Sequence, residues 1–224
     1  MGDAPGPDGR AATGVAGERA VMQLPPETIR ERLAGLRRHT ASHHDALERH
    51  VDIIGRLDSV EQYVEVLARL YGFYEPFEAE LGAAVVRWRL PFDFEARRKV
   101  PLIARDMVVG FGMAPATIHA LPRCPWAPLP TSPAAALGCL YVVEGATLGG
   151  QLIARHVERR LGIGAGTGAA FFVGYGEDVG PRWRTFCSVL ADALRDRAAE
   201  RDILTAASDT FIAFERWFMA ECAT

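Results

Sequence analysis

Cysteine is scarce in this chain, and its cysteines stand far apart. The 224 residues include four, Cys124, Cys139, Cys187 and Cys222, and none of them forms a C-x-x-C pair. Such spacing argues against a zinc ribbon or a disulfide framework, and it is typical of a protein in a reducing compartment. We therefore expect a cytoplasmic protein, and its length is sufficient for a substantial hydrophobic core.

Other signatures are missing as well. The sequence has no alternating strand pattern, no dinucleotide-binding glycine fingerprint and no internal repeat. Its longest apolar run is too short and too rich in glycine for a membrane span. The net charge of −3 argues against general nucleic-acid binding. Residues 1–24 are rich in Gly, Ala and Pro and lack a signal-peptide core, so they predict a disordered tail.

Helical periodicity covers the rest of the chain. Residues 25–222 therefore predict a single all-α domain built as a helical bundle. The expected helices cover residues 25–55, residues 59–82 after a capping box, residues 95–109 with an interruption near Pro101, and residues 116–121, 133–161, 181–198 and 201–222.

The most informative segment is the apolar helix expected over residues 133–161. Its interior contains four glycines, Gly138, Gly145, Gly149 and Gly150. Together they cost about 3–4 kcal/mol relative to alanine. One explanation is close packing of helices through small residues. The other is a strip of exposed backbone that bends the helix or touches a flat ligand, and this segment alone does not choose between the two.

The first expected helix carries four histidines. His43 and His44 flank its apolar stripe by about 50° each, whereas His39 and His50 lie toward the edge. Either of the first two could therefore face the core, and periodicity does not select one. A histidine in this position is either a core residue with a hydrogen-bonding partner or a metal ligand.

The other side chains limit the kind of metal site. A di-iron bundle needs Glu-x-x-His spacing on several helices. In the nearest candidate, Glu144 is followed three residues later by Thr147 rather than by histidine. A single histidine together with a bare glycine strip favours haem, because haem requires only an axial nitrogen from the protein.

Two segments resemble the haem oxygenase superfamily, particularly its bacterial branch associated with bacteriophytochromes. Residues 36–48, LRRHTASHHDALE, resemble the proximal helix, in which a threonine, here Thr40, precedes the ligand histidine by four residues. This register selects His44 over His43. Residues 138–151, GCLYVVEGATLGGQ, resemble the glycine-rich distal helix. The order of the two segments makes the resemblance more specific than either segment alone.

The resemblance implies a helical bundle of the haem oxygenase type, with haem between these two helices. It assigns His44 as the iron ligand and as the metal-binding residue. It assigns Gly145, Gly149 and Gly150 to the catalytic distal helix, where the absence of a Cβ lets the backbone approach the porphyrin.

The resemblance also implies a reaction and its partners. Haem of the b type, as cofactor and substrate, reacts with O2 to give biliverdin, CO and free iron. The electrons come from a separate ferredoxin or reductase, since the sequence has no flavin or nicotinamide motif. The implied acceptor of the product is a bacteriophytochrome, and neither nucleic acid nor a membrane is expected as a partner.

The remaining implied haem contacts are Arg37, Thr40, Tyr141 and Arg184. Arg37 and Arg184 would pair with the haem propionates, although each could also be an ordinary solvated charge. Tyr141 would offer a hydroxyl group on the distal side or simply pack there.

One departure from the family pattern keeps other interpretations open. Animal-type members carry an aspartate directly after the first distal glycine, and this chain has Ala146 there. A second hypothesis is therefore a non-enzymatic haem-binding or haem-trafficking protein on the same fold. A third is a bundle of this fold that binds no haem.

Overall fold

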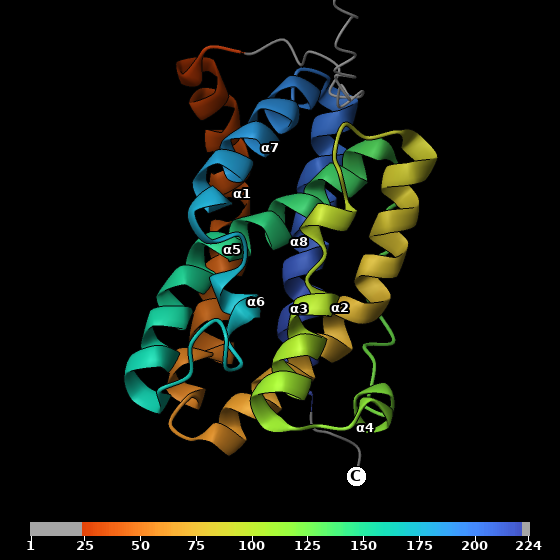
Figure 1. Ribbon diagram of the computed structural model, residues 1–224. Coiled ribbons are helices and arrows are strands. Elements are labelled where there is room, and N and C mark those ends of the chain that lie inside the picture. The colour runs from red at the N-terminus through yellow and green to blue at the C-terminus, as the bar shows by residue number, and fades with distance from the viewer. Residues whose placement is uncertain (1–23, 221–224) are drawn as a thin grey trace, which may run out of the picture.

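The computed structural model describes residues 24–220, which form helices and connecting turns without a strand (Figure 1). The predicted tail and the predicted domain end at residue 222 fall on residues outside this range and stay predictions. The α-helices are α1 (Pro26–Val51), α2 (Val60–Trp88), α3 (Val100–Arg105), α4 (Pro115–His119), α5 (Pro133–Leu161), α6 (Ala170–Val173), α7 (Val179–Ala193) and α8 (Arg197–Met219). Short 3-10 turns cover Ile54–Arg56, Glu95–Arg97 and Gly176–Asp178, and a π-helical turn covers Asp106–Gly110.

Two of the long helices, α2 and α5, begin where the sequence predicted. At the start of α2 the Ser59 hydroxyl accepts a hydrogen bond from the Gln62 amide at 3.3 Å, and the Gln62 side chain accepts one from the Ser59 amide at 3.1 Å. At the start of α5 the Ser132 hydroxyl accepts from the Ala135 amide at 3.0 Å, and Pro133 occupies the first turn. The predicted capping box and the predicted start of the glycine-bearing helix are confirmed.

The predicted end of α2 at Gly82 is wrong. The helix continues to Trp88 and ends at Arg89, which adopts a left-handed conformation with φ of 52°. Ala84 and Val85 in the extra turns are buried. Burial of these apolar side chains outweighs the roughly 1 kcal/mol that a glycine costs inside a helix.

The interruption expected near Pro101 is confirmed. A 3-10 turn ends at Arg97, and α3 starts at Val100 with Pro101 in its first turn, where a missing amide hydrogen costs nothing. The boundary between the last two helices lies earlier than predicted. Asp196 caps α8 by accepting a hydrogen bond from the Ala198 amide at 2.8 Å, so α7 does not reach residue 198.

The centre of the bundle is formed by α5 and α8. Figure 1 shows α1 and α2 on opposite flanks, with α5 crossing between them and α8 against it. By length and composition α5 is the one helix of the described residues that could cross a membrane, but half of its most apolar window is buried inside this bundle. It is therefore placed as a core helix.

Gly138 shows that close packing explains part of the glycine pattern. A Cβ at this position would collide with the carbonyl oxygen of Ile203 in α8 and would lie 3.0 Å from the Cβ of Ala206. No side chain fits between the two backbones here.

We predict that Gly138→Ala destabilises the protein by about 1–3 kcal/mol, because α5 and α8 must separate to admit the methyl group. Urea unfolding followed by circular dichroism measures this loss. Gly35→Ala is the matched control, since a Cβ at Gly35 meets nothing within 4 Å. Equal stability of the two variants would contradict the packing explanation.

Candidate functional site

A cavity of about 390 Å³ lies between α1 and α5. Its wall is mostly apolar, and six helices contribute residues to it. The residues that line it include Arg37, His44 and Leu47 of α1, Leu70, Phe73 and Tyr74 of α2, Tyr141 and residues 145–150 of α5, Phe171 and Phe172 of α6, Trp183 of α7, and Phe211 and Phe214 of α8.

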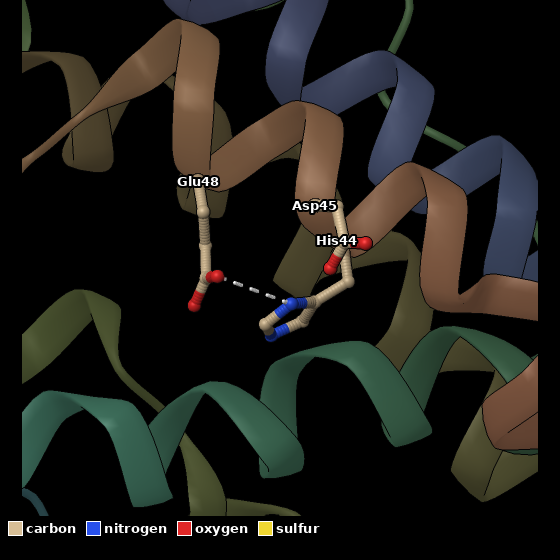
Figure 2. A group of neighbouring side chains, drawn as sticks. All are labelled: His44, Asp45 and Glu48. Carbon is tan, nitrogen blue, oxygen red and sulfur yellow. Dashed lines mark ion pairs between the residues drawn. The ribbon is translucent and has the colours of Figure 1, made fainter.

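On the α1 side, His44 rather than His43 lines the cavity. Figure 2 shows the His44 ring pointing from α1 toward α5. The Nδ1 atom of His44 lies 3.7 Å from a carboxylate oxygen of Glu48, one turn later on the same helix. The ring also meets Phe211 edge-on at 5.9 Å between centroids. The His44 side chain lines the cavity and is 55% exposed.

The same helix turn brings together a small group of possible metal ligands. One ligand atom each from His44, Asp45 and Glu48 lies within 4.8 Å of the others, as Figure 2 shows. All three residues are exposed, and neighbours one turn apart on a helix commonly meet in this way without an ion. The geometry that distinguishes His44 is the cavity that it faces.

On the α5 side, the glycines divide into two groups. A Cβ on Gly149 would meet nothing within 4 Å, and one on Gly145 would only touch Trp183 at 3.6 Å. A Cβ on Gly150, in contrast, would lie 2.9 Å from the carbonyl oxygen of Phe172. Thus Gly138 and Gly150 permit close packing, whereas Gly145 and Gly149 leave bare backbone along the cavity. The packing explanation is confirmed at Gly138 and Gly150, and the exposed backbone that the other explanation requires is present at Gly145 and Gly149.

Aromatic side chains form most of the remaining wall, and the sequence interpretation did not single them out. Phe73 and Phe214 contact each other at 4.9 Å between centroids, and Phe171 contacts Phe172 at the same distance. The amides of Ala170 and Phe171 donate to the buried carboxylate of Asp106, each at 2.8 Å. Asp106 therefore holds the short helix α6 and its two phenylalanines against the cavity. The adjacent pair Phe171 and Phe172 was the sequence signal that could have pointed to this wall.

Of the other four expected haem contacts, only two line the cavity. Arg37 and Tyr141 line the cavity, and Arg37 is exposed at its mouth. Thr40 does not reach the wall. It is buried and donates to the Leu36 carbonyl oxygen at 3.0 Å. Burial raises the pKa of Tyr141, while a hydrogen bond with Thr40 and the charge of Arg37 oppose this rise.

Arg184 lies apart from this group. Its side chain is exposed, and it is absent from the cavity wall. The neighbouring Arg182 is held on the outside by a hydrogen bond to the Ala96 carbonyl oxygen at 2.8 Å and by its position over the Tyr175 ring. A role of Arg184 in haem binding stays a prediction.

Behind the glycine strip lies a buried charged network. Arg97 donates from Nη1 to Glu144 at 2.6 Å, and their side chains are 9% and 2% exposed. Tyr175 donates its hydroxyl hydrogen to the other oxygen of Glu144 at 2.8 Å and accepts a hydrogen bond from Lys99 Nζ. Glu144 therefore forms a structural ion pair with Arg97. The sequence interpretation did not identify Lys99, which lines the cavity.

The geometry fits a flat, mostly apolar ligand. A single imidazole faces bare helix backbone across the cavity, and any Cβ at Gly149 would occupy the space between them. Aromatic side chains surround this space, and one exposed arginine stands at its mouth. These features define an all-α protein that holds a planar group between two helices and can ligate a metal at its centre, as haem requires.

Comparison with known proteins assigns the family. Residues 31–220 match the heme oxygenase family. A heme oxygenase of Xanthomonas campestris pv. campestris (strain 8004) is 32% identical over 170 residues, which are 75% of this chain and 94% of that protein. The chain therefore belongs to the heme oxygenase family.

Two solved structures share the fold. The NO- and CO-bound heme oxygenase from Neisseria meningitidis superposes with a TM-score of 0.65 at 20% identity, over 86% of this chain and 94% of that one. The heme oxygenase from Leptospira interrogans gives a TM-score of 0.66 at 19% identity, over 84% and 98%. The predicted all-α haem oxygenase fold is confirmed.

The buried ion pair generates a prediction about stability. Glu144→Gln leaves the charge of Arg97 buried without its carboxylate, so we expect a loss of about 3–5 kcal/mol in the free energy of unfolding. Urea unfolding measures it. The control is Asp192→Asn, which breaks an exposed pair with Arg195 and should cost less than about 1 kcal/mol. A loss at Glu144 no larger than at Asp192 would contradict the prediction.

Proposed function

We propose that this protein cleaves haem to biliverdin, CO and free iron, with His44 as the axial ligand and the α5 backbone at Gly145 and Gly149 against the opposite face. The observation that carries the proposal is the His44 imidazole facing bare glycine backbone across an apolar cavity. Bound haem supplies the redox-active iron and is itself the substrate, with O2 as co-substrate.

Each residue of the site has a separate proposed role in binding haem. His44 holds the iron, and Glu48 orients the imidazole through Nδ1, as second-sphere carboxylates do for metal-bound histidines. Gly145 and Gly149 let α5 lie close to the ring, whereas Gly150, expected to share this role, packs against the Phe172 carbonyl oxygen of α6. The aromatic walls exclude water from the ring. Arg37 pairs with a propionate at the cavity mouth. Thr40 acts through Tyr141, whose hydroxyl it holds.

Partners and location are inferred from the same proposal. The chain has no flavin or nicotinamide motif, so a ferredoxin or reductase supplies the electrons. A bacteriophytochrome is the proposed acceptor of biliverdin. The described cysteines Cys124, Cys139 and Cys187 are free, which agrees with a reducing, cytoplasmic location.

A specific observation favours a second candidate, a haem-binding or haem-trafficking protein without turnover. Ala146 lines the cavity directly after Gly145, and its methyl group cannot organise water or donate a hydrogen bond. Unless another group takes that part, the site would hold haem without degrading it.

Reconstitution with hemin tests both candidates. We expect a Soret band that decays in air after addition of ascorbate or a ferredoxin system, with biliverdin absorbance appearing. A stable Soret band would leave the haem-binding alternative, and the absence of any band would exclude both.

His44→Ala tests the axial ligand. We expect this variant to lose the wild-type iron coordination in the absorption and electron paramagnetic resonance spectra, and added imidazole to restore it. His43→Ala is the matched control on the same helix and should retain the wild-type spectra. If the two variants behaved in the reverse manner, the assignment of His44 would be wrong.

Gly149→Ala separates haem binding from folding. Without haem, the variant should be more stable by up to about 1 kcal/mol, because alanine favours the helix and its Cβ meets nothing within 4 Å. With hemin, the same methyl group occupies the cavity, so we expect at least a tenfold weaker affinity, or about 1.4 kcal/mol. Thermal unfolding and hemin titration give the two values. Unchanged hemin affinity would show that α5 does not contact haem at this residue.

A further inference from the structure

Lys99 is the one lysine among the 25 lysine and arginine residues of the chain. It is 3% exposed, and it lines the cavity between α1 and α5. Lysine is almost never fully buried without a partner, because its strongly hydrated ammonium group is costly to remove from water. The burial of Lys99 therefore requires partners that stabilise its ammonium group.

Hydrogen bonds hold the Lys99 ammonium group at the α5 side of the cavity. Nζ donates to the Tyr175 hydroxyl group and lies 3.9 Å from the centroid of its ring. The Tyr175 hydroxyl in turn donates to Glu144 of α5, 2.8 Å away, and Nζ lies 4.0 Å from the same carboxylate oxygen. Tyr175 and Glu144 thereby orient Nζ, and Lys99 lines the cavity.

Hydrogen bonds also fix the backbone of Lys99. The buried Glu78 carboxylate of α2 accepts hydrogen bonds from the Lys99 amide and, at 3.2 Å, from the Val100 amide. These are amides at the start of α3, where a carboxylate is favoured by the helix dipole. Glu78 therefore anchors the point at which the Lys99 side chain enters the cavity wall.

The charges that face Lys99 come from several elements. Glu144 and Glu78 favour its protonated form, and Arg97 and Arg182 oppose it. Burial has the largest effect and lowers the pKa of Lys99 to about 8. The group is therefore mostly an ammonium ion at neutral pH and becomes a neutral amine in mildly alkaline solution.

An ion-pairing role alone does not account for lysine here. Arginine forms multidentate pairs with carboxylates and keeps its charge at all accessible pH values, and this chain uses arginine at every other cationic position. In the adjoining strip of α5, Gly145, Ala146 and Gly149 have no polar side chain. The hydroxyl group of Thr147 already donates to the Glu144 carbonyl oxygen at 2.6 Å. Lys99 is a polar donor that borders the cavity next to the glycine strip.

We propose that Lys99 is a catalytic residue of the haem site, the hydrogen-bond donor and positive charge that the cavity presents on its α5 side, in place of a carboxylate at Ala146. Tyr175 and Glu144 are positioning residues that act through Lys99. This inference rests on the proposed function, because it requires haem in the cavity.

The carbon monoxide complex of the reduced, haem-loaded protein tests the proposal without turnover. A positive donor near bound CO lowers its C–O stretching frequency, which infrared spectroscopy reports. In the wild-type protein we expect the frequency to rise between pH 7 and 9 as Lys99 loses its proton. Lys99→Met should show the raised frequency at every pH, and Lys99→Arg should keep the lower one without the pH dependence.

The control is Arg195→Met. It removes an exposed cation that pairs with Asp192 and does not line the cavity, so the frequency should stay at the wild-type value. A wild-type frequency that does not respond to pH and equals that of Lys99→Met would overturn the proposal. Absence of a Soret band in the wild-type protein would instead refute the proposed function.

A second measurement needs no variant and covers the case in which Lys99→Met does not fold. Because the chain has a single lysine, labelling with 13C-lysine gives one side-chain Cε resonance in the NMR spectrum. We expect this resonance to shift when zinc protoporphyrin, a diamagnetic haem analogue, binds. Binding that is visible in the porphyrin spectrum but leaves the Cε resonance unchanged would place Lys99 away from the ligand and overturn the proposal.

Discussion

The structure depends on one constraint on α5, which must lack side chains on two of its faces for two different reasons. Toward α8 and α6, glycine is required at Gly138 and Gly150 because the neighbouring backbone leaves no room for a Cβ. Toward the cavity, Gly145 and Gly149 also lack a Cβ, although space for one is available there. The first pair is required by folding. The second pair has no packing requirement, and its helix-destabilising cost of about 2 kcal/mol agrees with the proposed haem contact on this face.

The buried charges compensate for this weak helix. Glu144 lies next to Gly145 and connects α5 to Arg97, to Tyr175 and through it to Lys99. These contacts come from two other parts of the chain, residues 97–99 and Tyr175, so α5 is stabilised by tertiary contacts as well as by its own helix propensity. A buried charge that lost its partners would cost several kcal/mol, and this makes the position of α5 specific.

The sequence predicted what depends on local signals. The capping residues Ser59 and Ser132 and the apolar periodicity located the long helices, and the resemblance of two motifs pointed to His44. It did not predict what depends on packing: the extension of α2 past Gly82, or the absence of Arg184 from the cavity wall. The presence of a single lysine was visible in the sequence, but only the fold shows that this lysine is buried at the cavity.

The polarity of the cavity also determines how an amphipathic planar ligand would enter it. His44 and Arg37 are exposed at one end, whereas Lys99 is buried at the other among aromatic residues and the buried Tyr74. Anionic groups placed at the buried end would have to lose their hydration, which is costly even near one ammonium group. At the mouth they stay hydrated beside Arg37. We therefore expect the apolar edge of the ligand to go inward, toward Lys99, which among the described residues is the buried cation that lines the cavity.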